Sequence, residues 1–150
     1  MFENIKFKSY LWIFSPIIFG LGSSAIFIPK NKIPKVRSIF NPPSWIFGIV
    51  WPILYLLLGY ASYLVWKSNN EKIDVLLQKY ILHVILLLLW WPIFIYFPNP
   101  FIASISLGLL AIYAIYLGWE FYKKNIIAGY CFIPYILWLC FATFLSAHII

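Results

Sequence analysis

Long apolar runs alternate with short polar stretches along the chain, and this pattern predicts the fold. Each run is long enough to cross the hydrocarbon core of a membrane, which takes about 20 helical residues. Most gaps between the runs are short, so neighbouring helices are expected to pack antiparallel. We therefore predict an all-α integral membrane protein, a single five-helix bundle over residues 1–150. The predicted helices cover residues 10–28, 44–66, 76–97, 101–122 and 126–149.

The composition agrees with this prediction. Hydrophobic residues make up 64% of the 150 positions and charged residues only 10%. A soluble domain carries about a quarter charged residues, so this chain has too few charges to cover a surface exposed to water. Its outer surface is expected to face lipid, and the protein to be a multi-pass membrane protein.

The positive charges lie in the gaps between the apolar runs. The chain has 11 Lys and Arg against 4 Asp and Glu, for a net charge of +7. This placement is typical of membrane-interface anchors and does not favour a nucleic-acid surface. Seven cations fall on the N-terminal side of the predicted bundle, namely Lys6, Lys8, Lys67, Lys72, Lys79, Lys123 and Lys124. Only four cations fall on the other side. Because the side with more Lys and Arg is usually cytoplasmic, the positive-inside rule predicts a cytoplasmic N-terminus.

The other four cations all lie in the longest gap, residues 29–43. They are Lys30, Lys32, Lys35 and Arg37. Four prolines in the same stretch predict an ordered, extended loop. At its end, Asn41 is expected to cap the next helix, with Pro42 at the first helical position.

Three predicted helices each have one face that carries a tryptophan, because the residues concerned recur at three- and four-residue steps. If the three faces converge, they would line a cavity walled by flat π surfaces, suited to a large planar apolar ligand. The alternative is that tryptophans form interfacial belts, which we expect for Trp12, Trp45, Trp66 and Trp119. The faces hold Gly48, Trp51, Tyr55, Leu58 and Ser62; His83, Leu87, Trp90 and Phe94; and Cys131, Tyr135, Trp138, Ala142 and Leu145.

The lone histidines and a stripe of small residues are weaker indications of function. A lone histidine such as His83 or His148 could ligate iron or relay protons, but it is more often a packing residue. The residues from Ser104 to Gly118 include a small-residue face that allows close helix approach, with a neighbour in the same chain or in another. The sequence shows no nucleophile–base pair, phosphate loop, metal-ligand cluster or group of carboxylates, so familiar catalysis has no support.

Three stretches together resemble the TspO/MBR family, the tryptophan-rich sensory proteins that include the mitochondrial translocator protein. FNPPSWIFGIVWPILYLLLGYASYLVW resembles the second-helix signature, and LWWPIFIYF at 89–97 the third-helix motif. FIPYILWLCFATFLS at 132–146 resembles the fifth-helix motif. The motifs stand in the family's order, and the resemblance covers nearly the whole chain.

This resemblance implies a five-helix bundle, commonly a homodimer, with a pocket beneath the loop that joins the first two helices. It implies porphyrin or haem as a possible ligand and no required cofactor. By the motif match, Trp51 and Trp138 correspond to the family's pocket tryptophans, and Trp90 to the aromatic residue of the third helix. The loop cations would then lie over the pocket and pair with porphyrin propionates, or contact lipid phosphates instead.

The chain departs from the family pattern at several pocket positions. Leu87 and Ser146 replace asparagines, and His83 replaces a frequent glutamine. Losing an amide removes a hydrogen-bond partner worth about 0.5–1.5 kcal/mol net, which His83 could replace. The leading hypothesis is a tetrapyrrole-binding sensor, regulator or carrier. The alternatives are a light-dependent porphyrin-degrading enzyme that uses Trp51 and Trp138, or a transporter or packing subunit for another apolar ligand.

Overall fold

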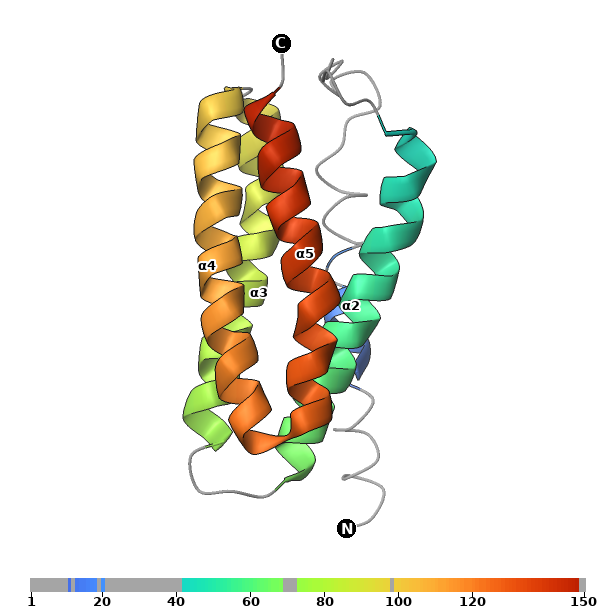
Figure 1. Ribbon diagram of the computed structural model, residues 1–150, viewed down its shortest axis with the longest axis vertical. Coiled ribbons are helices and arrows are strands. Elements are labelled where there is room, and N and C mark those ends of the chain that lie inside the picture. The colour runs from blue at the N-terminus through green and yellow to red at the C-terminus, as the bar shows by residue number, and fades with distance from the viewer. Residues whose placement is uncertain are drawn as a thin grey trace.

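The computed structural model describes residues 11, 13–18, 20, 42–68, 73–97 and 99–148, with every regular element in this part of the chain helical (Figure 1). Residues 11, 13–18 and 20 are helical as well. The remainder of the predicted first helix, and the loop that carries the four cations, lie outside the described residues. The four longer helices are α2 (Ser44–Lys67), α3 (Ile73–Tyr96), α4 (Pro100–Lys124) and α5 (Ile126–Ala147).

Each of these four helices is long and apolar enough to cross a membrane. A helix of 24 residues, such as α2 or α3, is about 36 Å long at 1.5 Å per residue, against a hydrocarbon core of about 30 Å. The mean hydropathy of their most apolar windows runs from 1.6 to 2.0. The chain is therefore a multi-pass integral membrane protein. Four spans lie in the described residues, and the fifth stays a prediction.

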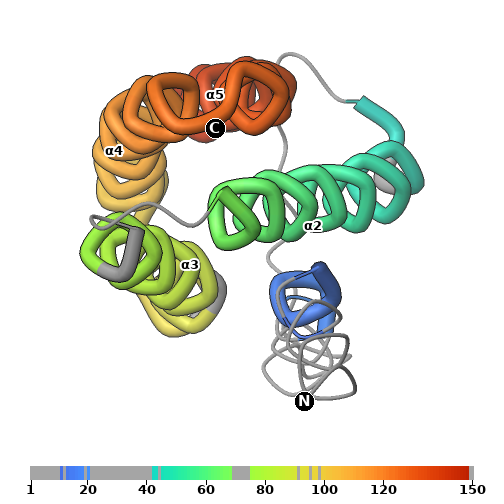
Figure 2. The backbone as a smooth tube through the Cα atoms, turned by 90° about the horizontal axis from the view of Figure 1, so that it is seen from below, coloured from blue at the N-terminus to red at the C-terminus, as the bar shows by residue number. Residues whose placement is uncertain are grey.

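The helices pack as neighbours in a bundle. Figure 2 shows them end-on, with α4 between α3 and α5, and α2 on the opposite side. The most extensive contact joins α4 to α5, followed by α2 with α5 and α3 with α4. The short helical segment near the N-terminus lies against α2, where Gly59 meets the backbone of Ile13. Lacking a Cβ, Gly59 lets the two backbones approach closely.

Asparagines set the starts of α4 and α5. The Asn99 side chain accepts a hydrogen bond from the Phe101 N–H at 2.9 Å, and Pro100 occupies the first turn. Asn125 alone separates α4 from α5, and its side chain accepts from the N–H groups of Ile127 and Ala128. Each cap satisfies backbone donors that a helix start leaves unpaired. The tight α3–α4 and α4–α5 connections follow from these caps.

The helix α2 begins at Ser44 as predicted, but its cap differs from the predicted one. The helix begins at Ser44 with Pro43 in the N-cap position and no side-chain cap, and Pro42 lies before the helix. Asn41 lies outside the described residues. The reason is that a residue followed by proline is pushed out of the helical region, so Pro42 cannot start a helix while Pro43 follows it.

The small-residue face of α4 packs within the same chain. It comprises Ser104, Gly108, Ala111, Ala114 and Gly118. A Cβ at Gly118 would lie 3.1 Å from Cβ of Phe132 on α5, and the Ser104 hydroxyl donates to the Thr143 carbonyl at 3.2 Å. Ala114 is fully buried. The close helix approach that this face permits is therefore the α4–α5 contact.

Candidate functional site

Two of the predicted tryptophan-bearing faces meet between α2 and α5. The rings of Trp51 and Trp138 touch edge to face, with centroids 6.4 Å apart and planes at 89°. Phe47 approaches Trp138 at 5.6 Å, Tyr55 stacks on Trp51 at 5.7 Å, and Phe141 lies 5.4 Å from Trp138. We call these five residues the α2–α5 aromatic cluster.

Helical spacing explains how each helix contributes to the cluster. Phe47, Trp51 and Tyr55 follow one another at four-residue steps along α2, and Phe141 comes three residues after Trp138 on α5. Side chains at such steps share one face of a helix. Tyr55 is buried at 3% exposure, whereas Trp51 and Trp138 are partly buried and pack against the core. The cluster therefore lies at the edge of the core.

In the contact between Trp51 and Trp138, the indole nitrogen of Trp138 has an unusual environment. Its Nε1 is buried and finds no hydrogen-bond partner among the described residues. A buried N–H that makes no hydrogen bond costs about 1–3 kcal/mol, and most buried donors in native proteins are paired. The aromatic cluster thus offers π surface together with one unused donor.

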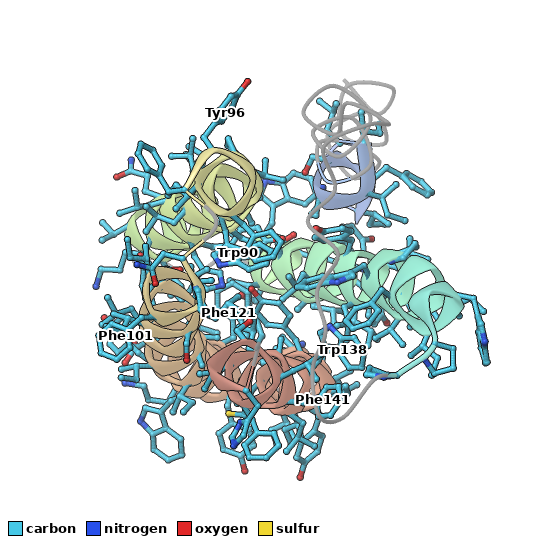
Figure 3. All side chains as sticks on the ribbon, turned by 90° about the horizontal axis from the view of Figure 1, so that it is seen from above. Trp90, Tyr96, Phe101, Phe121, Trp138 and Phe141 are labelled. Carbon is cyan, nitrogen blue, oxygen red and sulfur yellow. The ribbon has the colours of Figure 1, made fainter. Side chains whose placement is uncertain are left out.

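Trp90 on α3 is held differently. Its ring stacks on Phe94 with centroids 5.1 Å apart and planes at 11°, and its Nε1 donates to the Ala103 carbonyl of α4 at 3.4 Å. Figure 3 shows Trp90 and Trp138 on the inner side of the bundle, whereas Tyr96 and Phe101 point away from it. Trp90 therefore has a partner for its N–H on the neighbouring helix, unlike Trp138.

His83 joins α3 to α5 in the core. It is fully buried, and its Nε2 lies 2.7 Å from the Tyr135 hydroxyl. The Tyr113 ring of α4 meets the imidazole at right angles, with centroids 5.1 Å apart. The other ring nitrogen, Nδ1, has no hydrogen-bond partner in the described part of the chain. His83 thus links three helices, and it binds Tyr135 directly.

Two other predicted site residues, Leu87 and Ala142, lie in the core. Leu87 lies one turn after His83 at 3% exposure, and Ala142 lies one turn after Trp138 at 8%. The four loop cations lie outside the described residues. Sequence reasoning missed Phe47 and Phe141 as members of the aromatic cluster. Their spacing from Trp51 and Trp138 was the signal that could have identified them.

Exposure separates two kinds of tryptophan. Trp45 and Trp119, predicted as belt residues, are 65% and 60% exposed, whereas Trp51, Trp90 and Trp138 pack against the core. Trp66 was predicted as a belt residue but also packs against the core. In the described residues, no three His, Cys, Asp or Glu side chains are placed to hold a metal ion.

Fold and site together define a multi-pass helical membrane protein with an aromatic inner face. Residues 13–150 match the TspO/MBR family, and the chain belongs to this family. It is 32% identical to the translocator protein homolog of Schizosaccharomyces pombe over 121 residues, which are 78% of this chain and 74% of that protein.

Two further relatives agree. The translocator protein of Homo sapiens is 36% identical over 110 residues, which are 71% of this chain and 65% of the human protein. The tryptophan-rich protein TspO of Chlorobaculum tepidum is 29% identical over 119 residues, covering 77% and 74% of the two chains. The relatives thus come from a bacterium, a yeast and an animal.

Proposed function

We propose that this protein binds a porphyrin or another planar tetrapyrrole at the α2–α5 aromatic cluster and acts as a sensor, regulator or carrier. The observation that carries this proposal is the contact between Trp51 and Trp138, beside a buried Trp138 N–H that has no hydrogen-bond partner in the described part of the chain. Flat rings bind favourably against aromatic side chains in offset or edge-to-face geometry. Porphyrins are also the ligands that the sequence resemblance implies.

The roles of the residues differ. Trp51 and Trp138 would contact the macrocycle, and the Trp138 N–H would donate to an acceptor atom on the ligand. His83 is fully buried and bonded to Tyr135, so it would act on the ligand through Tyr135 rather than by contact. Leu87, which replaces the family's asparagine, supplies only apolar surface.

Titration with protoporphyrin tests the proposal. The purified protein in mild detergent is expected to show saturable quenching of tryptophan fluorescence below about 100 μM ligand, an affinity of roughly 5–6 kcal/mol. Haemin serves as a second tetrapyrrole. An apolar compound of similar size without a planar macrocycle is the control for partition into detergent. Quenching that rises linearly with concentration, equally for all three compounds, would sink the proposal.

The same cluster favours one alternative, light-dependent degradation of the porphyrin. Trp51 and Trp138 place two oxidisable indoles in contact, next to where the macrocycle would lie. Illumination of the complex in air, with the Soret band followed over time, separates binding from degradation. Loss of the band in the wild type but not in Trp51→Phe would favour an enzyme. Equal rates in both and in free porphyrin would favour simple binding.

A further inference from the structure

We propose that the outer surface where α3 and α4 meet binds the headgroup of an anionic phospholipid, with Lys79 as the residue that contacts the phosphate. This site lies outside the α2–α5 aromatic cluster and does not depend on it. Its components are a cation fixed on an outward-facing surface, a neighbouring carboxylate that pairs with another lysine, and two apolar stripes that lead away from the cation toward the middle of the membrane.

The Lys79 side chain is held in place from α4. Its Nζ donates to the Tyr116 hydroxyl at 2.7 Å and lies 5.2 Å from the centre of that ring. The Tyr113 hydroxyl donates to the Lys79 backbone carbonyl at 2.7 Å, and its ring stacks on Tyr116. An ammonium group has three N–H donors. With one given to Tyr116, two are available on an exposed side chain.

Lys79 lies inside an apolar span and faces outward. It falls within the candidate span Val75–Phe94, about 9 Å along α3 from Ile73 at 1.5 Å per residue. Charged residues in spans are costly and normally face the bundle interior or pair with another charge. From this depth, a lysine side chain reaches toward the interface. At the interface, a lipid phosphate is an anion that such a side chain can meet.

The neighbouring carboxylate is already engaged. Glu120 lies one turn beyond Tyr116 on α4 and forms an ion pair with Lys123 at 2.5 Å. No other ion pair is found among the described residues. The hydrogen-bond partner of the Lys79 ammonium, Tyr116, is a neutral phenol. The cluster of Lys79, Glu120 and Lys123 therefore keeps one net positive charge on the lipid-facing side.

Two exposed apolar stripes begin at this cation and favour a lipid over free phosphate. Leu82 and Leu86 follow Lys79 at helical spacing and are 51% and 41% exposed. Ile112 and Leu109 precede Tyr116 in the same way and are 66% and 63% exposed. Because α3 and α4 run antiparallel (Figure 1), both stripes lead from the charged end toward the membrane centre. They suit two acyl chains below a phosphate.

Native mass spectrometry of the full chain in mild detergent tests this site. Phosphatidylglycerol and phosphatidylcholine with identical acyl chains are titrated separately. The wild type is expected to bind phosphatidylglycerol more tightly, and Lys79→Gln to lose about fivefold of that affinity while its affinity for phosphatidylcholine stays the same. Lys67 is an exposed lysine at the C-terminal end of α2, close in sequence to the start of α3. Lys67→Gln is therefore the matched control, and it should lose much less affinity for phosphatidylglycerol.

Two further measurements keep the result interpretable. Lys79→Gln leaves the bond from Tyr113 to the backbone carbonyl in place, so its unfolding temperature should match that of the wild type. Soluble glycerol phosphate should fail to displace the bound lipid, because it lacks the acyl chains. The proposal is overturned if Lys79→Gln binds phosphatidylglycerol like the wild type, if Lys67→Gln loses as much, or if glycerol phosphate displaces the lipid.

Discussion

At the scale of single residues, Trp138 and His83 are both buried polar groups with one nitrogen unused in the described part of the chain. They differ in whether the side chain makes any hydrogen bond. His83 has a strong partner in Tyr135 at 2.7 Å, and this contact ties α3 to α5. The Nε1 of Trp138 is the only donor of its side chain, so a partner for it must come from outside the described residues.

Replacing Trp138 by Phe is expected to weaken porphyrin binding without destabilising the protein. Phenylalanine keeps an aromatic ring beside Trp51 but removes the unused N–H. The lost hydrogen bond to the ligand would cost about 0.5–1.5 kcal/mol, or about two- to twelvefold in Kd, as followed by the shift of the porphyrin absorption band. Trp119→Phe, on the exposed surface, is the control. Unchanged affinity in Trp138→Phe would contradict the assigned role.

Replacing His83 by Leu is expected to destabilise the fold. The change strands the buried Tyr135 hydroxyl, which costs about 1–3 kcal/mol. Thermal unfolding in detergent of His83→Leu, Tyr135→Phe and the double variant gives the coupling between the two groups. The double variant should be less destabilised than the sum of the two single variants. Strict additivity would show that the 2.7 Å contact does not stabilise the protein.

At the scale of helices, hydropathy located the elements well and their ends less well. The helices α2 to α5 correspond to the predicted helices over residues 44–66, 76–97, 101–122 and 126–149. However, α3 begins three residues earlier than predicted, at Ile73, and α4 runs two residues further, to Lys124. Hydropathy registers the apolar core of a span, whereas backbone hydrogen bonding continues through polar residues in the headgroup region.

For the candidate site, the sequence predicts which residues share a face of one helix. Spacing along one helix placed Trp51 with Tyr55 on one face of α2, and Trp138 with Tyr135 on one face of α5. It could not show that Trp90 donates to Ala103 or that His83 reaches Tyr135. Those contacts depend on how far each helix is rotated and shifted against its neighbour, which periodicity within a single helix does not determine.

Two glycines on α2 offer a matched test of helix packing. A Cβ at Gly59 would run into the backbone of Ile13, whereas a Cβ at Gly48 would meet nothing within 4 Å. Gly59→Ala is therefore expected to destabilise by about 1–3 kcal/mol through overpacking. Gly48→Ala should stabilise by roughly 0.5–1 kcal/mol, the usual helical preference of alanine over glycine. Equal unfolding temperatures for the two variants would count against the close approach at Gly59.

At the scale of the whole molecule, the predicted homodimer needs a different surface from the one first considered. The small-residue face of α4 is occupied by α5 of the same chain, through Gly118 with Phe132. Because this face is used internally, we predict that a dimer forms through exposed outer faces. Mass measurement in mild detergent should give twice the 17.7 kDa of one chain, before allowing for bound detergent and lipid. A monomer at every protein concentration would be evidence against a dimer.

The loop cations Lys30, Lys32, Lys35 and Arg37 lie outside the described residues. A porphyrin carries two propionates that favour water, while its macrocycle favours the aromatic cluster. Phe47 and Trp51 lie in the first turns of α2, which begins at Ser44, directly after the segment that carries these cations. A ligand held there with its propionates toward water would bring them to the same end as the loop. We therefore expect the cations to pair with the propionates.

Replacing all four cations by Gln separates this pairing from simple attraction to lipid phosphates. A contact with a propionate at a partly exposed site is worth on the order of 1 kcal/mol and is screened by salt. The fourfold variant should bind protoporphyrin several-fold more weakly, and the difference should shrink at high ionic strength. Neutral porphyrin dimethyl ester is the matched ligand, and its affinity should hardly change. If both ligands lose affinity equally, the cations do not recognise the propionates, and their role is to anchor the loop at the lipid surface.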